Sequence, residues 1–144
     1  MTTRFGDQEG AKIGYNPHKP GGASHHPLLC TIAGTRLCLH MTYRAGDACS
    51  SAGWIEAMET VLARLPKGIT PFLNRADVSF SCEESLSWHE ASEQHPDYLF
   101  KLKKRARVME ALSSIKEAEW EGKAGFGVAQ VAEREIQLHG WTRK

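Results

Sequence analysis

Two stretches of sequence decide the predicted fold of this chain. The first is Gly6-Asp7-Gln8-Glu9-Gly10-Ala11, which runs into Gly14-Tyr15-Asn16-Pro17-His18-Lys19-Pro20-Gly21, and the second is Asn74-Arg75-Ala76-Asp77. Residues 6–26 are rich in Gly, Pro, Asn and His. They are therefore predicted to form a loop or an irregular hairpin rather than a regular element. Loops of this kind often carry functional residues.

The chain has 144 residues, of which 41% are hydrophobic, enough for one domain with a core and too few for two. Its longest apolar run, Leu28 to Ala33, is far shorter than the roughly 18 residues of a membrane span. Residues 1–5 contain no apolar signal segment. We therefore expect a soluble, cytoplasmic protein that does not contact a membrane. The cysteines lack Cys-x-x-Cys spacing and are expected to be reduced thiols in or near the core: Cys30, Cys38, Cys49 and Cys82.

The first half of the chain after the loop predicts a hairpin, a helix and a strand. Leu28 to Ala33 and Arg36 to Arg44 are short apolar segments separated by a turn, which is typical of an antiparallel hairpin. Alternation in the second segment predicts one buried face: Leu37, Leu39, Met41 and Tyr43. A helix capped by Ser50 or Ser51 follows, with apolar residues at helical spacing from Ile55 to Leu65, and Pro66-Lys67-Gly68 ends it. Ile69 to Leu73 then predicts a short strand that ends at Asp77.

The second half predicts two helices and two strands. Ser81 and Glu84 fit a capping box for a helix that ends at His95-Pro96. Tyr98 to Leu102 predicts a strand, Ala106 to Trp120 a third helix, and Val131 to Leu138 an extended segment after a break at Gly122 to Gly127. Strands that alternate with helices indicate an α/β or α+β domain in which helices pack on a mixed sheet.

The opening motifs resemble those of the DDE-type insertion-sequence transposases, which have a ribonuclease-H-like core. Three further stretches also resemble that family and occur in the same order along the chain as in the family: Pro27-Leu28-Leu29, Gly34-Thr35-Arg36-Leu37-Cys38-Leu39 and Leu138-His139-Gly140-Trp141. The resemblance implies that residues 1–144 are a partial catalytic domain, truncated at both ends. Residues 6–26 are then its loop, residues 28–121 its core, and residues 126–144 the start of a β-rich insertion. The first, central strand of the family's sheet is expected to be missing.

The resemblance assigns the middle of the family's three catalytic acids to Asp77. In such enzymes the acids bind two Mg²⁺ or Mn²⁺ ions about 3.5–4 Å apart for in-line displacement at phosphorus. Asp77 alone is the catalytic and metal-binding residue expected here, and because the other two acids are missing we expect no stable metal binding. From position alone, an aspartate at the end of a strand is more often a residue that caps the following turn, and the resemblance is what favours the metal-binding role of Asp77.

Two departures from the family pattern fall at its most characteristic motifs. The family continues the aspartate motif with Ser-Gly-Phe, whereas this chain has Val78-Ser79-Phe80. The loop, which in the family reads Lys-Pro-Gly-Arg-Pro-Ser, is here Lys19-Pro20-Gly21-Gly22-Ala23-Ser24 and lacks an arginine suited to phosphate. Both departures are typical of a copy no longer under functional constraint.

A basic segment is the candidate DNA-binding surface, although such a run in an arbitrary protein is more often a solvated strand end. In a strand-transfer enzyme this segment would contact the phosphates of the DNA backbone. Such binding weakens as the salt concentration rises and does not depend on the DNA sequence. The expected contacts are Lys19, Arg75, Lys101, Lys103, Lys104, Arg105 and Arg107. A zinc site at His18, His25, His26 and Cys30 is a minor alternative, because adjacent histidines of a strand point apart.

Two functions remain open at this point. The first is a DNA transposase fragment that is itself inactive, with double-stranded DNA and a transposase homo-oligomer as the partners that the resemblance implies. The second is a non-catalytic module that binds DNA or interacts with a complete transposase. The formal charge of +1 does not decide between them, because a balanced total can hide a basic face.

Overall fold

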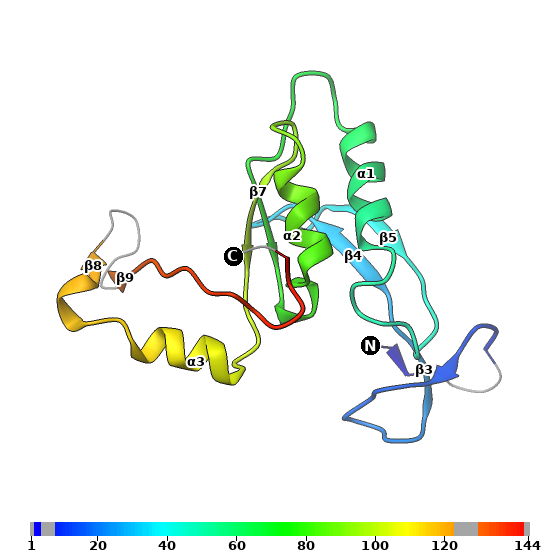
Figure 1. Ribbon diagram of the computed structural model, residues 1–144. Coiled ribbons are helices and arrows are strands. Elements are labelled where there is room, and N and C mark those ends of the chain that lie inside the picture. Colours follow the sequence, from blue (N-terminus) through cyan, green and yellow to red (C-terminus); the bar gives the residue numbers. More distant parts are fainter. Residues whose placement is uncertain (1, 4–7, 123–129, 143–144) are drawn as a thin grey trace.

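The computed structural model describes residues 2–3, 8–122 and 130–142. These residues form a mixed α and β structure with three α-helices and several small sheets (Figure 1). The prediction of an α+β domain is confirmed. A single mixed sheet is not observed, because the described strands pair in one group of three and three groups of two.

The segment predicted as a loop contains part of the three-stranded sheet. Strands β1 (Thr2–Thr3), β2 (Lys12–Ile13) and β3 (Ala23–His25) pair antiparallel in the order β1-β3-β2. Gly14 permits a close backbone approach, since a Cβ there would lie 2.0 Å from the carbonyl oxygen of Gly46. The antiparallel pair of the short strands β2 and β3 agrees with the irregular hairpin, one of the two forms predicted for residues 6–26, and residues 6–7 lie outside the described part.

The predicted hairpin is confirmed as β4 (Leu28–Thr31) and β5 (Cys38–Thr42), which pair antiparallel. The predicted buried face is wrong. Leu37, Met41 and Tyr43 are 61%, 60% and 56% exposed, and Leu29, the register partner of Met41, is also exposed. Leu28, on the opposite face, is buried. Leu39, the remaining residue of the predicted face, is half-buried, so this apolar face is largely but not wholly exposed among the described residues.

Helix α1 (Trp54–Arg64) confirms the first predicted helix and its end before Pro66. Its predicted serine cap is wrong, because Gly53 precedes the helix in a left-handed conformation with φ 71° and no side chain caps the helix. The turn that leads into the helix is instead held by Arg44, whose guanidinium donates to the carbonyls of residues 49, 50 and 52.

Strands β6 (Leu73–Ala76) and β7 (Asp97–Phe100) pair in parallel. The strand predicted at Ile69 to Leu73 begins later, because Ile69 donates to Pro66 in a turn and Pro71 has no N–H to give to a ladder. Among the described residues β6 pairs with β7 alone, so the other edge of β6 carries no described strand.

Helix α2 (Glu83–Glu90) connects these strands, but the predicted capping box is wrong. Ser81 donates its hydroxyl to the carbonyl of Val78 at 2.9 Å, so it does not cap the helix. The helix ends at Glu90 rather than at His95-Pro96. His95 stacks on Trp88 with ring centroids 3.9 Å apart.

An aromatic cluster joins α1 to the elements around β7. The ring of Trp54 in α1 lies 5.4 Å from Phe80, 5.9 Å from His89 and 6.0 Å from Phe100, measured between centroids. Trp54 is buried, together with Ala57, Met58 and Val61 of the same helix. This face of α1 therefore forms the centre of the core.

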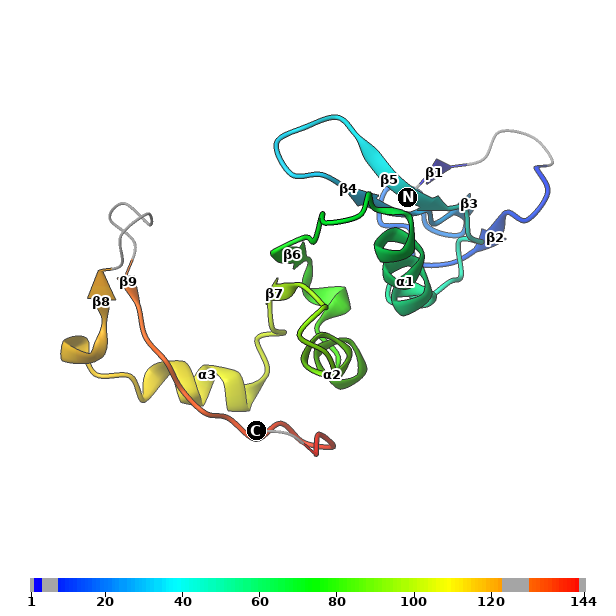
Figure 2. The same ribbon diagram turned by 90° about the horizontal axis from the view of Figure 1, so that it is seen from above.

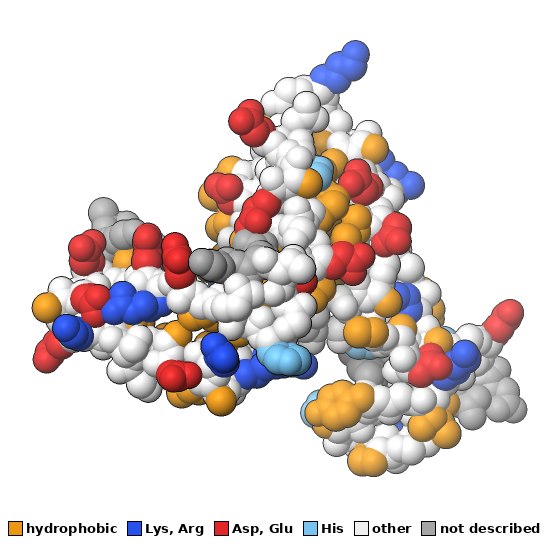
Figure 3. Space-filling view, viewed as in Figure 1, with side chains coloured by type: hydrophobic (Ala, Val, Ile, Leu, Met, Phe, Trp, Pro, Cys, Tyr) orange, Lys and Arg blue, Asp and Glu red, His pale blue; other side chains and the backbone are white. Residues whose placement is uncertain are grey.

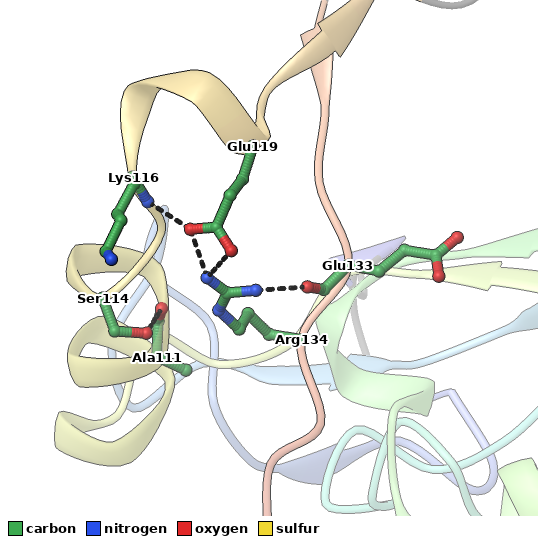
Figure 4. A network of polar contacts seen from close by, with 6 residues as sticks. All are labelled: Ala111, Ser114, Lys116, Glu119, Glu133 and Arg134. Carbon is green, nitrogen blue, oxygen red and sulfur yellow. Dashed lines mark hydrogen bonds and ion pairs between the residues drawn. The ribbon is translucent and has the colours of Figure 1, made fainter.

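The third helix is shorter than predicted: α3 spans Ala106–Ser113, and a separate 3₁₀ turn covers Glu117–Glu119. Figure 4 shows the polar network that fixes this break, in which the carboxylate of Glu119 accepts from the backbone N–H of Lys116 at 2.7 Å and from the guanidinium of Arg134. The Arg134 contact is the main reason that the pKa of Glu119 is lowered. This network ties the returning chain to the end of the helical segment.

The final predicted strand is also wrong over most of its length. Strands β8 (Glu121–Gly122) and β9 (Gln130–Val131) form a short antiparallel pair, and no strand continues to Leu138. Leu138 is nevertheless buried. The break predicted at Gly122 to Gly127 falls largely on residues 123–127, which lie outside the described part.

The chain exposes more surface than a compact protein of its mass. Its accessible area is 10828 Å², whereas a compact monomer of 16.0 kDa exposes about 7,400 Å². Seen from above in Figure 2, the pairs β4–β5 and β6–β7 form separate blocks with α1 beside them. None of the helices in the described ranges combines the length and the apolar character that crossing a bilayer requires.

Two methionines provide a matched test of this core. Met58 is 3% exposed and Met41 is 60% exposed. We expect Met58→Ala to lower the free energy of unfolding by about 2–5 kcal/mol and Met41→Ala by less than about 0.5 kcal/mol, as measured by urea unfolding followed by circular dichroism. Equal losses in the two variants would contradict the packing of α1.

Candidate functional site at the end of strand β6

Asp77 lies where the sequence placed it, directly after a strand. It is exposed, has an extended backbone with ψ 173°, and precedes a 3₁₀ turn at Val78–Phe80. Its backbone carbonyl accepts from Phe80, but its carboxylate makes no capping hydrogen bond. The alternative in which Asp77 caps the following turn through its side chain is therefore not observed, and the carboxylate faces solvent.

The parallel pairing brings Asp77 beside a lysine. Ala76 is the register partner of Phe100, so Asp77 and Lys101 both leave the sheet at the same edge. Arg75 lies two residues before Asp77 and thus on the same face of the strand. All three side chains are exposed. One carboxylate and two predicted DNA-binding cations consequently meet at the carboxyl ends of β6 and β7.

These three residues line a cavity of about 950 Å³. The cavity lies between the pair β4–β5 and the pair β6–β7, with Met58 and Val61 of α1 also in its wall. Most of its other lining residues are apolar. The charged groups therefore stand beside an apolar interior.

The first residue of the Asn-Arg-Ala-Asp motif has a structural role. The Asn74 amide nitrogen lies 3.2 Å from Nε2 of His89 and 3.9 Å from the sulfur of Met58. His89 Nδ1 lies 2.8 Å from the carbonyl oxygen of Pro96. Because that carbonyl only accepts and the Asn74 amide nitrogen only donates, His89 is neutral with its proton on Nδ1. The Asn74 side chain thus links β6 to α1 through Met58 and to α2 through His89.

The pKa of His89 is lowered from its ordinary value. Burial is the larger cause, and the nearby His95 also lowers the pKa, whereas the hydrogen bond to Pro96 and the charge of Glu90 act in the opposite direction. This role was not predictable from the sequence, because a lone histidine on a short helix has no motif around it. Its partners Asn74 and Pro96 come from two other segments of the chain.

Every lysine and arginine of the predicted basic segment, residues 101–107, is exposed. Lys103 and Arg105 line a second cavity of about 180 Å³ together with Val78 and Ser79, which follow Asp77. Lys104 and Arg107 line neither cavity. On the face shown in Figure 3, Lys and Arg side chains gather where α3 begins. Part of the predicted basic surface therefore adjoins Asp77.

Lys19 belongs to a different region. It lies in the connection between β2 and β3, where the Asn16 side-chain oxygen accepts from the backbone N–H groups of His18 and Lys19, each at 3.2 Å. No residue of the Gly14 to Ser24 segment lines the cavity beside Asp77. The structure does not bring Lys19 into the group formed by Arg75, Asp77 and Lys101.

The histidines near the start make separate contacts. His25 is buried with its ring 4.4 Å from that of Tyr43, and His26 Nδ1 lies 3.1 Å from the carbonyl oxygen of Ala48. Among the described residues, no group of three His, Cys, Asp or Glu side chains could hold a metal ion. Asp77 is therefore part of no such group in the described ranges.

The cysteines divide into two environments. All four are free thiols; Cys30 and Cys82 are half-buried, whereas Cys38 and Cys49 are exposed, contrary to the expectation of a core position. Burial, with a smaller contribution from Cys38, raises the pKa of the Cys30 thiol. Hydrogen bonds from Ser51 are the main reason that the pKa of Cys49 is lowered.

Comparison of the chain with models of protein families, with curated proteins and with solved structures found no match.

The neutral state of His89 predicts a pH-dependent stability. Because its pKa is lower in the folded chain, the unfolded chain takes up the proton first as the pH falls below about 6.5. The stability contributed by neutral His89 is thus present above that pH and is lost as the pH falls through the folded-state pKa. We expect His89→Gln to reduce the fall in melting temperature between pH 7.5 and about 5, whereas exposed His139→Gln keeps the profile of the unchanged chain. Parallel profiles for all three proteins would contradict this role.

Proposed function

We propose that the chain is part of the catalytic domain of a DDE-type transposase with a ribonuclease-H-like core, and that its own residues bind DNA near the reacting phosphate. The observation that carries the proposal is the exposed Asp77 carboxylate at the end of a parallel strand, beside Lys101. Open α/β sheets place their ligands at this edge. The cytoplasmic location expected from the sequence belongs to the same proposal.

The arrangement of cations supports the DNA contact. Arg75 and Lys101 line one cavity with Asp77, and Lys103 and Arg105 line a second cavity with Val78 and Ser79, the two residues after Asp77. A DNA backbone laid across this edge would meet four cations within a short span. Such contacts attract phosphates without reading bases. Lys104 and Arg107 extend the same surface along the chain, whereas Lys19 would contribute only if the DNA reached the three-stranded sheet.

The chain's own carboxylate has a limited chemical role. Two-ion phosphoryl transfer requires several carboxylate oxygens around the ions, and Asp77 is the one acid of the family pattern in this sequence. In the intact family the ions are Mg²⁺ or Mn²⁺ and supply activation of the attacking oxygen. In this chain the residues around Asp77 bind and orient DNA, and a second transposase copy is the further partner implied.

A non-catalytic module that binds DNA or interacts with a transposase is the second candidate. The observation in its favour is that the exposed cations of residues 101–107 outnumber the one acid beside them. In this function the basic surface holds DNA and Asp77 has no chemical role. Where the module binds DNA, the two candidates share that contact and differ in the origin of the chain and in the role of Asp77.

Charge removal at the predicted surface tests the DNA contact. We expect the double variant Lys101→Ala and Lys103→Ala to bind double-stranded DNA more weakly regardless of sequence, and to reduce the slope of log affinity against log salt concentration by about 2. Fluorescence anisotropy over a salt series measures both quantities. Lys67→Ala, an exposed lysine in the α1–β6 connection, is the matched control and should bind as the unchanged chain does. Equal binding by the double variant would contradict the proposed surface.

The same preparations test catalysis. Incubation of supercoiled DNA with the chain in Mg²⁺ or Mn²⁺ should leave the DNA uncut, because one carboxylate does not hold two ions. Nicking that is lost on Asp77→Ala would overturn the expected inactivity.

A further inference from the structure

Two strand edges face the large cavity from opposite sides. In the described part of the chain, β4 pairs only with β5 and β6 only with β7. Cys30 and Thr31 of β4 line one side of the cavity, and Leu73 to Ala76 of β6 line the other. Exposed strand edges of this kind present N–H and C=O groups that another strand can pair with.

The register identifies the backbone groups of β6 that are available. Phe72 accepts a hydrogen bond from the N–H of Asp97 in β7. Because the N–H and C=O of successive strand residues point to opposite sides, residues 72, 74 and 76 face β7. The backbone groups of Leu73 and Arg75 therefore point away from β7, toward the cavity that both residues line.

The side chains around the cavity define what would fit between these edges. Its interior is apolar, with Cys30, Leu39, Met58, Val61, Leu73 and Phe100 in the wall. Its charged residues are Arg75, Lys101 and Asp77, so cations outnumber carboxylates by two to one. An occupant needs apolar side chains in the middle and a negative charge at one end.

The surface area leaves room for a partner. The chain exposes about 3,400 Å² more than a compact protein of its mass. A stable interface takes about 800 Å² from each partner. An occupant that covers part of this surface would therefore bury enough area for specific association.

We infer that the cavity between β4 and β6 is a docking groove for an extended, apolar peptide strand with an acidic end, supplied by a partner protein. Such a strand would pair with the free backbone groups of Leu73 and Arg75 and bury its side chains against α1. A helix does not fit, since its backbone groups are bonded internally. DNA does not fit the interior either, because its charged backbone would be desolvated against apolar walls. β-strand addition is an established mode of peptide recognition.

A designed peptide tests this groove on the full chain. The probe is a fluorescein-labelled peptide of alternating valine and threonine with glutamates at one end, and its control carries prolines at the central positions. We expect anisotropy to show binding of the first peptide and at least about tenfold weaker binding of the second, which lacks the N–H groups for pairing. Cys30→Trp, which fills the groove, should weaken binding by about tenfold. Cys38 of β5 is exposed and does not line the groove, so Cys38→Trp should leave binding within about twofold.

Thiol alkylation gives a second measurement that needs no variant. Cys30 lines the groove and Cys49 does not. The peptide should slow iodoacetamide modification of Cys30 at least about fivefold and leave Cys49 unchanged, because alkylation requires access to the thiol. Mass spectrometry reads each site separately.

Four results would overturn the inference. They are unchanged Cys30 alkylation with the peptide present, equal protection by the proline peptide, equal protection by a small apolar dye, and a chain that is already dimeric with Cys30 protected. The third would indicate a small-molecule pocket, and the fourth a second copy as the occupant. Sedimentation without peptide distinguishes the last case.

Discussion

Burial of one face of α1 joins two pairs of strands that have no hydrogen-bonded ladder between them in the described part of the chain. Helix α1 contacts β5 on one side and α2 on the other. Trp54 reaches the rings of Phe80, His89 and Phe100, while Met58 lies against Asn74 of β6. Since β4 and β6 are not paired with each other, this apolar contact takes the place of a continuous sheet. The cavity beside Asp77 exists because the contact holds the pairs in place without closing the space between them.

The elements that the sequence predicted well are those fixed by nearby residues. The hairpin at Leu28 to Thr42 depends on two apolar segments and a turn, and α1 depends on helical spacing that ends before Pro66. The elements predicted wrongly depend on competing contacts, one of which joins residues far apart in the sequence. Ser81 bonds back to Val78 instead of capping α2, and the Glu119–Arg134 contact ends the third helical segment early. The spacing of apolar and polar residues along a short stretch of sequence does not show which of these contacts forms.

The candidate site divides in the same way. The position of Asp77 after a strand was predictable, because an apolar run ends just before it. Its neighbour Lys101 was not, since their proximity follows from the parallel register of Ala76 with Phe100. The bond between Asn74 and His89 likewise joins two elements across the core. The resemblance to DDE transposases suggested which residues to consider, and the register determined that Arg75 and Lys101 accompany Asp77 whereas Lys19 does not.

Amide hydrogen exchange, followed residue by residue by NMR, tests most directly that the space between β4 and β6 is open in the isolated chain. The alternation of β6 predicts slow exchange at Asn74 and Ala76, whose N–H groups face β7, and fast exchange at Leu73 and Arg75, whose N–H groups face the cavity. Slow exchange at all four residues would contradict the account, because it would mean that a further strand already pairs with β6.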